Sequence, residues 1–209
     1  MITIPEPDEV LRDLSHLLTI TYSALDYGTY QSLSFFENHK DEADKRIDPF
    51  LGPHLVRFYA KKALIKDNNG YFRTENIANS GLFIYNENYN LRIKKSDRGK
   101  LPAPGHSISR QQYYRQMPIN LPEFKEYQSS DKLNLLILWN LDPAEKYRIG
   151  SLSLACPKDG GVSTKTVVAY WHIFVPYGIL TGTGDTILPG VTKDLPLTFS
   201  IDEETGDDF

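Results

Sequence analysis

The sequence has 209 residues, of which 40% are hydrophobic and 24% are charged, with a formal net charge of -4. This balance is typical of a globular chain long enough to bury its own core, and it excludes a disordered or fibrous class. The single cysteine, Cys156, excludes an intramolecular disulfide, and the acidic N-terminus is unlike a signal peptide. We therefore expect a cytoplasmic protein without a membrane-spanning segment and without an intramolecular disulfide.

The N-terminal region, residues 1–66, is predicted to be helical. Hydrophobic residues recur at spacings of three and four between residues 8 and 38, which indicates one or two amphipathic helices. A break is expected near Gly28, because glycine is costly inside a helix. A further helix is predicted to begin at Pro53, since proline is favoured at the first helical position. Residues 37–50 are highly charged and are interpreted as a surface loop or a solvated helix.

A hairpin is predicted from residues 81–85 and 89–95, joined by a turn rich in asparagine. The second strand alternates, with Tyr89 among the hydrophobic residues of one face and Arg92 and Lys94 on the other. The pattern predicts a strand with one solvent-exposed, cationic face.

A loop and a short helix are predicted to follow this strand. Residues 96–107 contain two prolines and two glycines, which indicates a loop. Ser107 or Ser109 is expected to begin a short helix that ends at Gln116, before Pro118.

The most continuously hydrophobic stretch, residues 133–142, is predicted to be the buried central strand of a sheet. Two further strands, at residues 147–156 and 164–175, follow at hairpin spacing. Since both faces of residues 133–142 are hydrophobic, we expect both faces to be covered. The predicted fold class is α+β, with N-terminal helices packed on a mainly antiparallel sheet.

The domain organisation predicted is a single domain with an acidic tail. Residues 67–201 are expected to form the sheet-containing core together with the helices, and residues 197–201 are a candidate edge strand. Residues 202–209 form the acidic tail.

Cys156 and His172 are the first candidates for a nucleophile and its base. If Gly160 and Gly161 form a tight hairpin turn, Cys156 lies opposite Lys165, and His172 lies roughly 23 Å along the ladder. This register predicts that the two side chains do not form a catalytic pair.

No metal or cofactor site is predicted. The histidines are scattered without metal-ligand spacing. Residues 178–185 are rich in glycine, but Pro189 and Gly190 follow too soon for the helix that a phosphate loop requires. This segment is interpreted as a loop.

Asp142, at the end of a predicted strand, suggests a metal-dependent nuclease as an alternative. Such enzymes often place an aspartate at the end of one strand and Glu-x-Lys on the next strand. The only Glu-x-Lys, at residues 123–125, follows Pro122 in a segment that is a poor strand former. Asp142 before Pro143 is more simply the first residue of a turn.

Charge is distributed unevenly along the chain. Residues 1–52 hold 10 acids and 4 bases, a net charge of -6, and residues 116–209 hold 13 acids and 7 bases, also -6. Residues 53–115 hold 4 acids and 12 bases, a net charge of +8. Cationic side chains supply phosphate contacts, and tyrosines can stack on unpaired bases.

We therefore interpret residues 92–115, the basic segment, as the candidate binding surface of an intracellular binding or regulatory module whose partner is a nucleic acid or an acidic protein. The alternative function is a metal-dependent hydrolase acting on nucleic acid through Asp142 and Glu145. A plain solvated face, or neutralisation by the acidic flanks, remains open as well. The candidate partner-binding residues are Arg92, Lys94, Lys95, Arg98, Lys100, His106, Arg110, Tyr113, Tyr114 and Arg115.

Overall fold

The computed structural model describes residues 3–38, 51–66, 70, 72–77, 81–96, 100–118, 132–145, 148–160 and 167–182. Within these residues the fold is α+β, as predicted, with helices packed on one six-stranded sheet. Residues 39–50, the candidate edge strand 197–201 and the acidic tail lie outside the described part. No helix in the described part is long and hydrophobic enough to cross a membrane.

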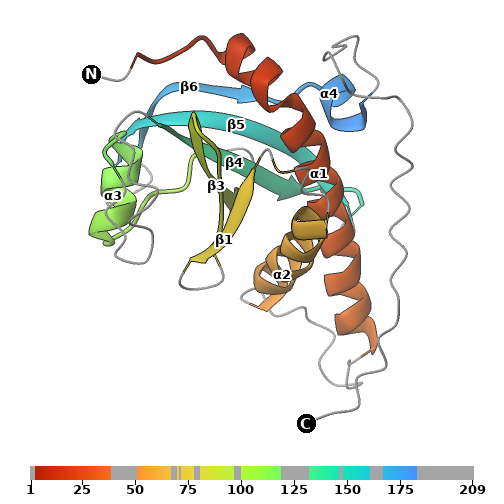
Figure 1. Cartoon of the computed structure of the whole chain (residues 1–209). Coiled ribbons are helices and arrows are strands. Elements are labelled where there is room, and N and C mark those ends of the chain that lie inside the picture. Colours follow the sequence, from red (N-terminus) through yellow and green to blue (C-terminus); the bar gives the residue numbers. More distant parts are fainter. Residues whose placement is uncertain are drawn as a thin grey trace.

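The first helix, α1 (Pro7–Asn38), is continuous for 32 residues, so the predicted break near Gly28 is wrong. It runs across the sheet and beyond it, with α2 (Leu51–Lys66) beside its C-terminal half (Figure 1). Gly28 faces α2 there, and a Cβ atom at Gly28 would lie 2.5 Å from the carbonyl oxygen of Val56. The glycine therefore serves close helix packing, and that contact outweighs its low helix propensity.

The sheet has the order β1-β2-β3-β4-β5-β6 and is mixed. Neighbouring strands are antiparallel except β3 and β4, which pair in parallel with Tyr89 opposite Leu133. A parallel pair needs a crossover connection, and residues 96–132, which include the short helix α3, provide it. The elements are β1 (Arg73–Ile77), β2 (Gly81–Tyr85), β3 (Tyr89–Lys95), α3 (Ile108–Tyr114), β4 (Leu133–Leu141), β5 (Ile149–Asp159) and β6 (Val168–Phe174).

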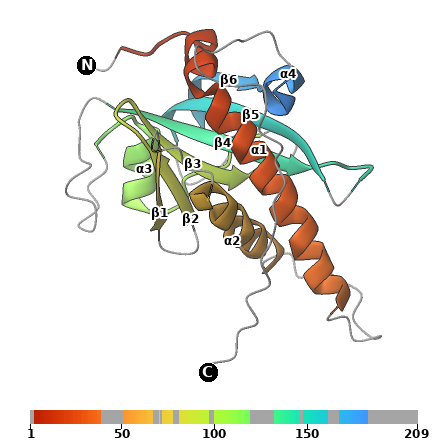
Figure 2. The ribbon, with the colours of Figure 1, turned by 45° about the vertical axis from the view of Figure 1, so that its right-hand side comes forward.

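The central strand β4 is buried on both faces, as predicted. On one face, which we call the α1 face, Leu135, Ile137 and Trp139 pack in a hydrophobic cluster with α1 and α2. On the other, the α3 face, Leu136 and Leu138 pack in a second cluster beneath α3. Figure 2 shows α1 crossing in front of the strands and α3 on the far side of the sheet. The two clusters together place β4 in the middle of the core.

The hairpin of β5 and β6 differs from the predicted one. β5 continues through Pro157 to Asp159, and β6 begins only at Val168, so the connection is longer than a tight glycine turn. The predicted register is therefore wrong, because His172 lies opposite Ala155 and Trp171 lies opposite Cys156.

A short helix, α4 (Tyr177–Thr181), follows β6 where the sequence predicted a loop. Gly182 ends it in the left-handed conformation, with φ of 68°. Thr19 of α1 donates a hydrogen bond of 2.6 Å to the carbonyl of Ile179, which holds α4 against α1.

Candidate functional site

The structure separates the ten candidate binding residues into an exposed and a buried group. The exposed residues are Lys95, Lys100, His106, Arg110 and Arg115. The buried ones are Arg92, Tyr113 and Tyr114, and Lys94 is partly buried. Arg98 lies outside the described residues. The predicted solvent-exposed, cationic face of β3 is thus wrong, since the side chains of Asn90 and Arg92 are only 5% and 6% exposed.

The face is buried because α3 lies across it. The Tyr113 hydroxyl donates to the carbonyl oxygens of Asn90, at 2.7 Å, and Leu135, so it bridges β3 and β4. The Tyr114 hydroxyl donates to the carbonyl oxygen of Pro102 in the preceding loop. These two tyrosines, which the sequence suggested as stacking partners for bases, are therefore part of the core.

Two polar residues that sequence reasoning missed hold α3 in place. The side chain of Asn134 donates to the carbonyl oxygens of Tyr113 and Met117, at 3.2 and 3.1 Å. The Gln116 amide donates to the carbonyl oxygens of Asn134 and Pro157, at 2.8 and 2.7 Å, and accepts a bond from the Asn134 backbone. The signal in the sequence is Asn134 itself, an amide inside a hydrophobic strand that must find partners when buried.

Aromatic rings lie beneath the cations of β3. The guanidinium carbon of Arg92 is 4.6 Å from the centre of the Tyr113 ring. The Lys94 ammonium is 5.3 Å from the Tyr114 ring centre, and its hydrogen bond to the Tyr114 hydroxyl is long, at 3.4 Å. A ring face attracts a cation, but it carries no net charge. The rings therefore hold these side chains without neutralising them.

Positive charge in this part of the fold is largely unbalanced. Within the described residues, the only ion pair of the basic segment joins Arg115 to Asp159, at 2.8 Å. The Nε atom of Arg92 is buried and has no hydrogen-bond partner there. Burial lowers the pKa of Arg92, and nearby Arg110 lowers it further.

Lys94 also lies among positively charged side chains. Burial, followed by the charges of Arg92, Arg110 and Arg57, lowers the pKa of Lys94 to about 8. Among the described residues, no carboxylate is one of the groups that act on it. A lysine in such surroundings loses its proton far more readily than a solvated one.

Cys156 and His172 do not form a catalytic pair, for a reason other than the predicted one. They are close in the sheet, but Cys156 belongs to the cluster on the α1 face, whereas His172 lies opposite Ala155, which belongs to the α3 face. His172 instead contacts the Ser153 hydroxyl, at 3.0 Å. Burial raises the pKa of the Cys156 thiol to about 12, so it behaves as a small hydrophobic side chain.

Asp142 forms a turn, as its sequence context predicted. Its Oδ1 atom accepts hydrogen bonds from the backbone N–H groups of Ala144, at 2.7 Å, and Glu145, at 3.1 Å. These bonds lower the pKa of Asp142. Among the described residues, no group of three histidine, cysteine or acidic side chains could hold a metal ion. Residues 123–125 lie outside the described part.

A cleft that sequence reasoning missed lies beside the turn between β2 and β3. Its volume is about 610 Å³, and it is lined by Gly70, Arg73, Tyr85, Asn86, Glu87, Asn88 and Lys132. The Lys132 ammonium lies 5.5 Å from the centre of the Tyr85 ring. The cleft combines cations, one acid and amides, and so does not by itself indicate one ligand class.

Comparison with protein-family models gives no match, and comparison with curated proteins and with solved structures gives no significant match. The geometry and charge of this chain are therefore the basis on which its function is inferred.

Proposed function

We propose that the protein is a binding or regulatory module that engages an anionic partner, a nucleic acid or an acidic protein, at the α3 surface. We define this surface as the exposed bases Lys100 and Arg110 with the partly buried Lys94 behind them. The observation that carries the proposal is that none of these three bases has an acidic partner among the described residues. Clustered charge of one sign attracts a partner of the opposite sign.

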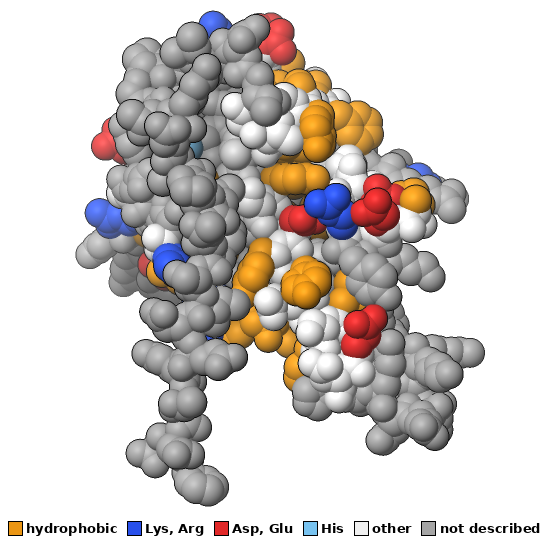
Figure 3. Space-filling model, turned by 90° about the vertical axis from the view of Figure 1, so that its right-hand side faces the viewer, with side chains coloured by type: hydrophobic (Ala, Val, Ile, Leu, Met, Phe, Trp, Pro, Cys, Tyr) orange, Lys and Arg blue, Asp and Glu red, His pale blue; other side chains and the backbone are white. Residues whose placement is uncertain are grey.

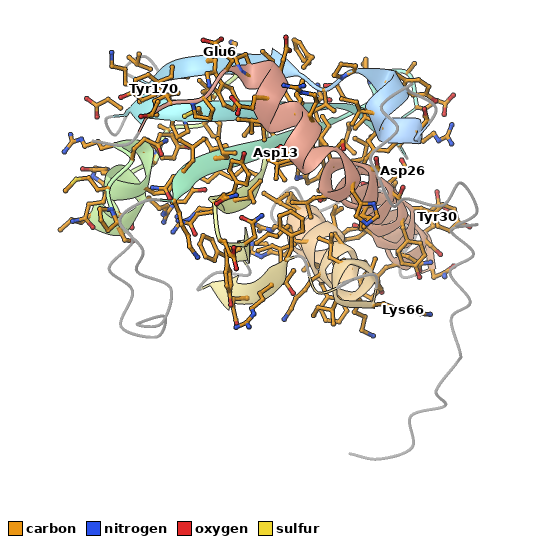
Figure 4. All side chains as sticks on the ribbon, turned by 45° about the horizontal axis from the view of Figure 1, so that its top comes forward. Glu6, Asp13, Asp26, Tyr30, Lys66 and Tyr170 are labelled. Carbon is orange, nitrogen blue, oxygen red and sulfur yellow. The ribbon has the colours of Figure 1, made fainter. Side chains whose placement is uncertain are left out.

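The distribution of acids supports this choice of surface. Glu6 lies just before α1, and Asp13 and Asp26 lie on α1, all apart from α3 (Figure 4). Two of them have structural partners: Asp13 accepts a hydrogen bond of 2.7 Å from the Tyr89 hydroxyl, and Asp26 accepts one of 2.9 Å from the backbone of Ile149. They therefore do not offset the charge of the α3 surface.

The hydrolase alternative has less support. Asp142 is already used by its turn, and Glu145 lies 3.8 Å from Arg148 in an exposed ion pair. The cytoplasmic location expected from the sequence belongs to the proposal, and the buried free thiol of Cys156 is consistent with a reducing compartment.

The test is a titration with labelled single- and double-stranded DNA and RNA and with an acidic polypeptide, at several salt concentrations and with and without Mg²⁺. We expect binding that weakens with salt and weakens again when Lys100 and Arg110 are replaced together by alanine. For a nucleic acid, removing one cation that neutralises a phosphate should reduce the slope of log affinity against log salt by about 0.7 to 0.9.

The matched control replaces Arg12 of α1 and Lys62 of α2 by alanine, which changes the net charge equally. This control should bind like the wild type. Binding that ignores both salt and the α3-surface substitutions would contradict the proposal, and so would an equal decrease in the control. Cleavage that depends on Mg²⁺ would favour the hydrolase alternative.

A further inference from the structure

We propose that Arg92, Lys94 and Arg110 form a site for one phosphoryl group of the anionic partner. This inference rests on the proposed function and names the chemistry at its centre. The site is the junction of β3 and the first turn of α3, where a buried guanidinium, a partly buried ammonium and an exposed guanidinium come together.

The local geometry brings the three cations to one place. Arg92 and Lys94 are two residues apart on β3, so their side chains leave the strand on the same face. Arg110 precedes Tyr113 and Tyr114 by three and four residues on α3, so it lies on the same side of the helix as the two rings. Arg92 lies over the first ring and Lys94 beside the second.

The surroundings of Arg92 favour a bound anion at this place. Its side chain is 6% exposed, and its Nε donor has no partner among the described residues. Buried charged donors are costly unless they are paired and hydrogen-bonded. The Tyr113 ring faces the guanidinium and does not supply an acceptor for the Nε donor at its edge.

A phosphoryl group fits these three side chains better than a carboxylate does. Two guanidinium groups and one ammonium group present more donors than the two oxygens of a carboxylate can accept. A phosphate monoester offers three oxygens and a charge near -2, and arginine binds such oxygens in a bidentate manner. The exposed Arg110 and the buried Arg92 would then bind different oxygens of one group.

The pKa of Lys94 reports whether an anion is bound at the site. The groups that act on its ammonium are Arg92 on its own strand, Arg110 and Tyr114 on α3, and Arg57 on α2. Burial, followed by the charges of these three cations, lowers its pKa to about 8 in the free protein. A bound anion reverses that effect, so phosphate binding raises the pKa of Lys94 and takes up a proton near pH 8.

The experiment follows the side-chain resonances of Lys94 by NMR in lysine-labelled, full-length protein, with Lys94→Met as the assignment standard. The pH titration is run in inorganic phosphate and in chloride at equal ionic strength. We expect phosphate to raise the pKa of Lys94 by about one unit or more, as for an opposite charge at contact distance. Arg110→Gln, a change at an exposed position, should weaken the apparent phosphate affinity about tenfold, and Lys62→Gln on α2 should not.

The second arm distinguishes the sources of the phosphoryl group. A 5′-phosphorylated oligonucleotide is compared with the same strand ending in a hydroxyl: a Lys94 shift with both indicates a backbone phosphate, and a shift with the first alone indicates a terminal one. A Lys94 pKa that stays the same in phosphate and with both strands would overturn the site. An equal shift with an acidic polypeptide would overturn the phosphoryl assignment in favour of carboxylates.

The two proposals can fail separately. Salt-dependent oligonucleotide binding without any Lys94 shift would leave the α3 surface standing and remove the phosphoryl site. A Lys94 shift in inorganic phosphate, with no binding of any polymer, would support the site and contradict the partner class.

Discussion

At the scale of single residues, this protein places the cations of β3 over aromatic rings. Arg92 and Lys94 lie over Tyr113 and Tyr114, and Lys95 lies 5.8 Å from the centre of the Trp139 ring. Such contacts contribute about 0.5 to 2 kcal/mol each, which is less than the cost of removing a charge from water. The positive charge therefore destabilises the free fold unless a partner is bound, which is a common property of functional sites.

Lys94 allows the cost of burying a positive charge to be measured. Its pKa is about 8 in the folded chain and 10.5 when solvated, so the unfolded state binds the proton more tightly. The charge of Lys94 therefore lowers the free energy of unfolding most below pH 8. This penalty disappears as the pH rises through 8 to 10.5. We predict that Lys94→Met is more stable than the wild type at pH 7, by on the order of 1 to 3 kcal/mol, and that the difference shrinks towards pH 10.

Urea unfolding at several pH values, in buffers without phosphate, measures that difference. Lys95→Met, at the exposed neighbouring position, is the control and should differ little from the wild type at any pH. A difference for Lys94→Met that stays constant from pH 7 to pH 10 would show that the position does not carry the proposed charge penalty.

At the scale of elements, close contacts determine where helices lie. Gly28 keeps α1 continuous and brings it against the backbone of α2 at Val56. Gln116 and Asn134 fix the end of α3 to β4 and β5 through backbone hydrogen bonds. The covered face of β3 follows from these contacts and not from the composition of the strand.

Gly28→Ala tests the contact between α1 and α2. On an exposed helix face this substitution stabilises by about 1 kcal/mol, because alanine has the higher helix propensity. Here the new Cβ atom would meet a backbone oxygen at 2.5 Å, so we expect a decrease of roughly 1 to 3 kcal/mol in the free energy of unfolding.

Chemical denaturation measures this decrease, with Tyr30→Ala as the control because Tyr30 is 62% exposed on the same helix. The control should change stability by less than about 1 kcal/mol. A Gly28→Ala variant that is more stable than the wild type would contradict the packing role of the glycine.

At the scale of the whole molecule, one hydrophobic cluster joins the helices to the sheet. It contains Leu18 and Leu25 of α1, Val56 of α2, Leu91 of β3 and Leu154 of β5, all nearly inaccessible to solvent. The helices also present hydrophobic side chains outward, including Tyr30 and Phe58, which is 53% exposed. Figure 3 shows hydrophobic side chains at the surface between charged ones on the side to the right in Figure 1.

The shared cluster predicts that residues 1–66 and the sheet unfold together. Far-ultraviolet circular dichroism reports mainly on α1 and α2, and tryptophan fluorescence reports on Trp139 and Trp171 in the sheet. We expect the two urea transitions to coincide, as they do for a two-state domain. An early loss of the helical signal, with fluorescence unchanged, would show that the N-terminal region is a separate unit.

Sequence patterns alone determined the fold class and several of the elements. The periods of 3.6 and 2 identified α1, α2, the β2-β3 hairpin and the doubly hydrophobic strand β4, since these periods record which residues share a face. They also identified Asp142 as a turn residue, because an aspartate before proline accepts nearby backbone N–H groups. Such interactions are local in the chain.

The tertiary structure decided what covers each face and which strands are neighbours. The parallel pairing of β3 with β4, the register that places Ala155 opposite His172, and the burial of Arg92 beneath α3 all depend on contacts between segments distant in the chain. The alternation of residues along β3 predicts that Arg92 and Lys94 lie on the same face of the strand. It does not predict whether that face is exposed to water or covered by a helix. The candidate site therefore moved from an open strand face to the junction of β3 and α3, because Tyr113 and Tyr114 fold onto the strand as core residues.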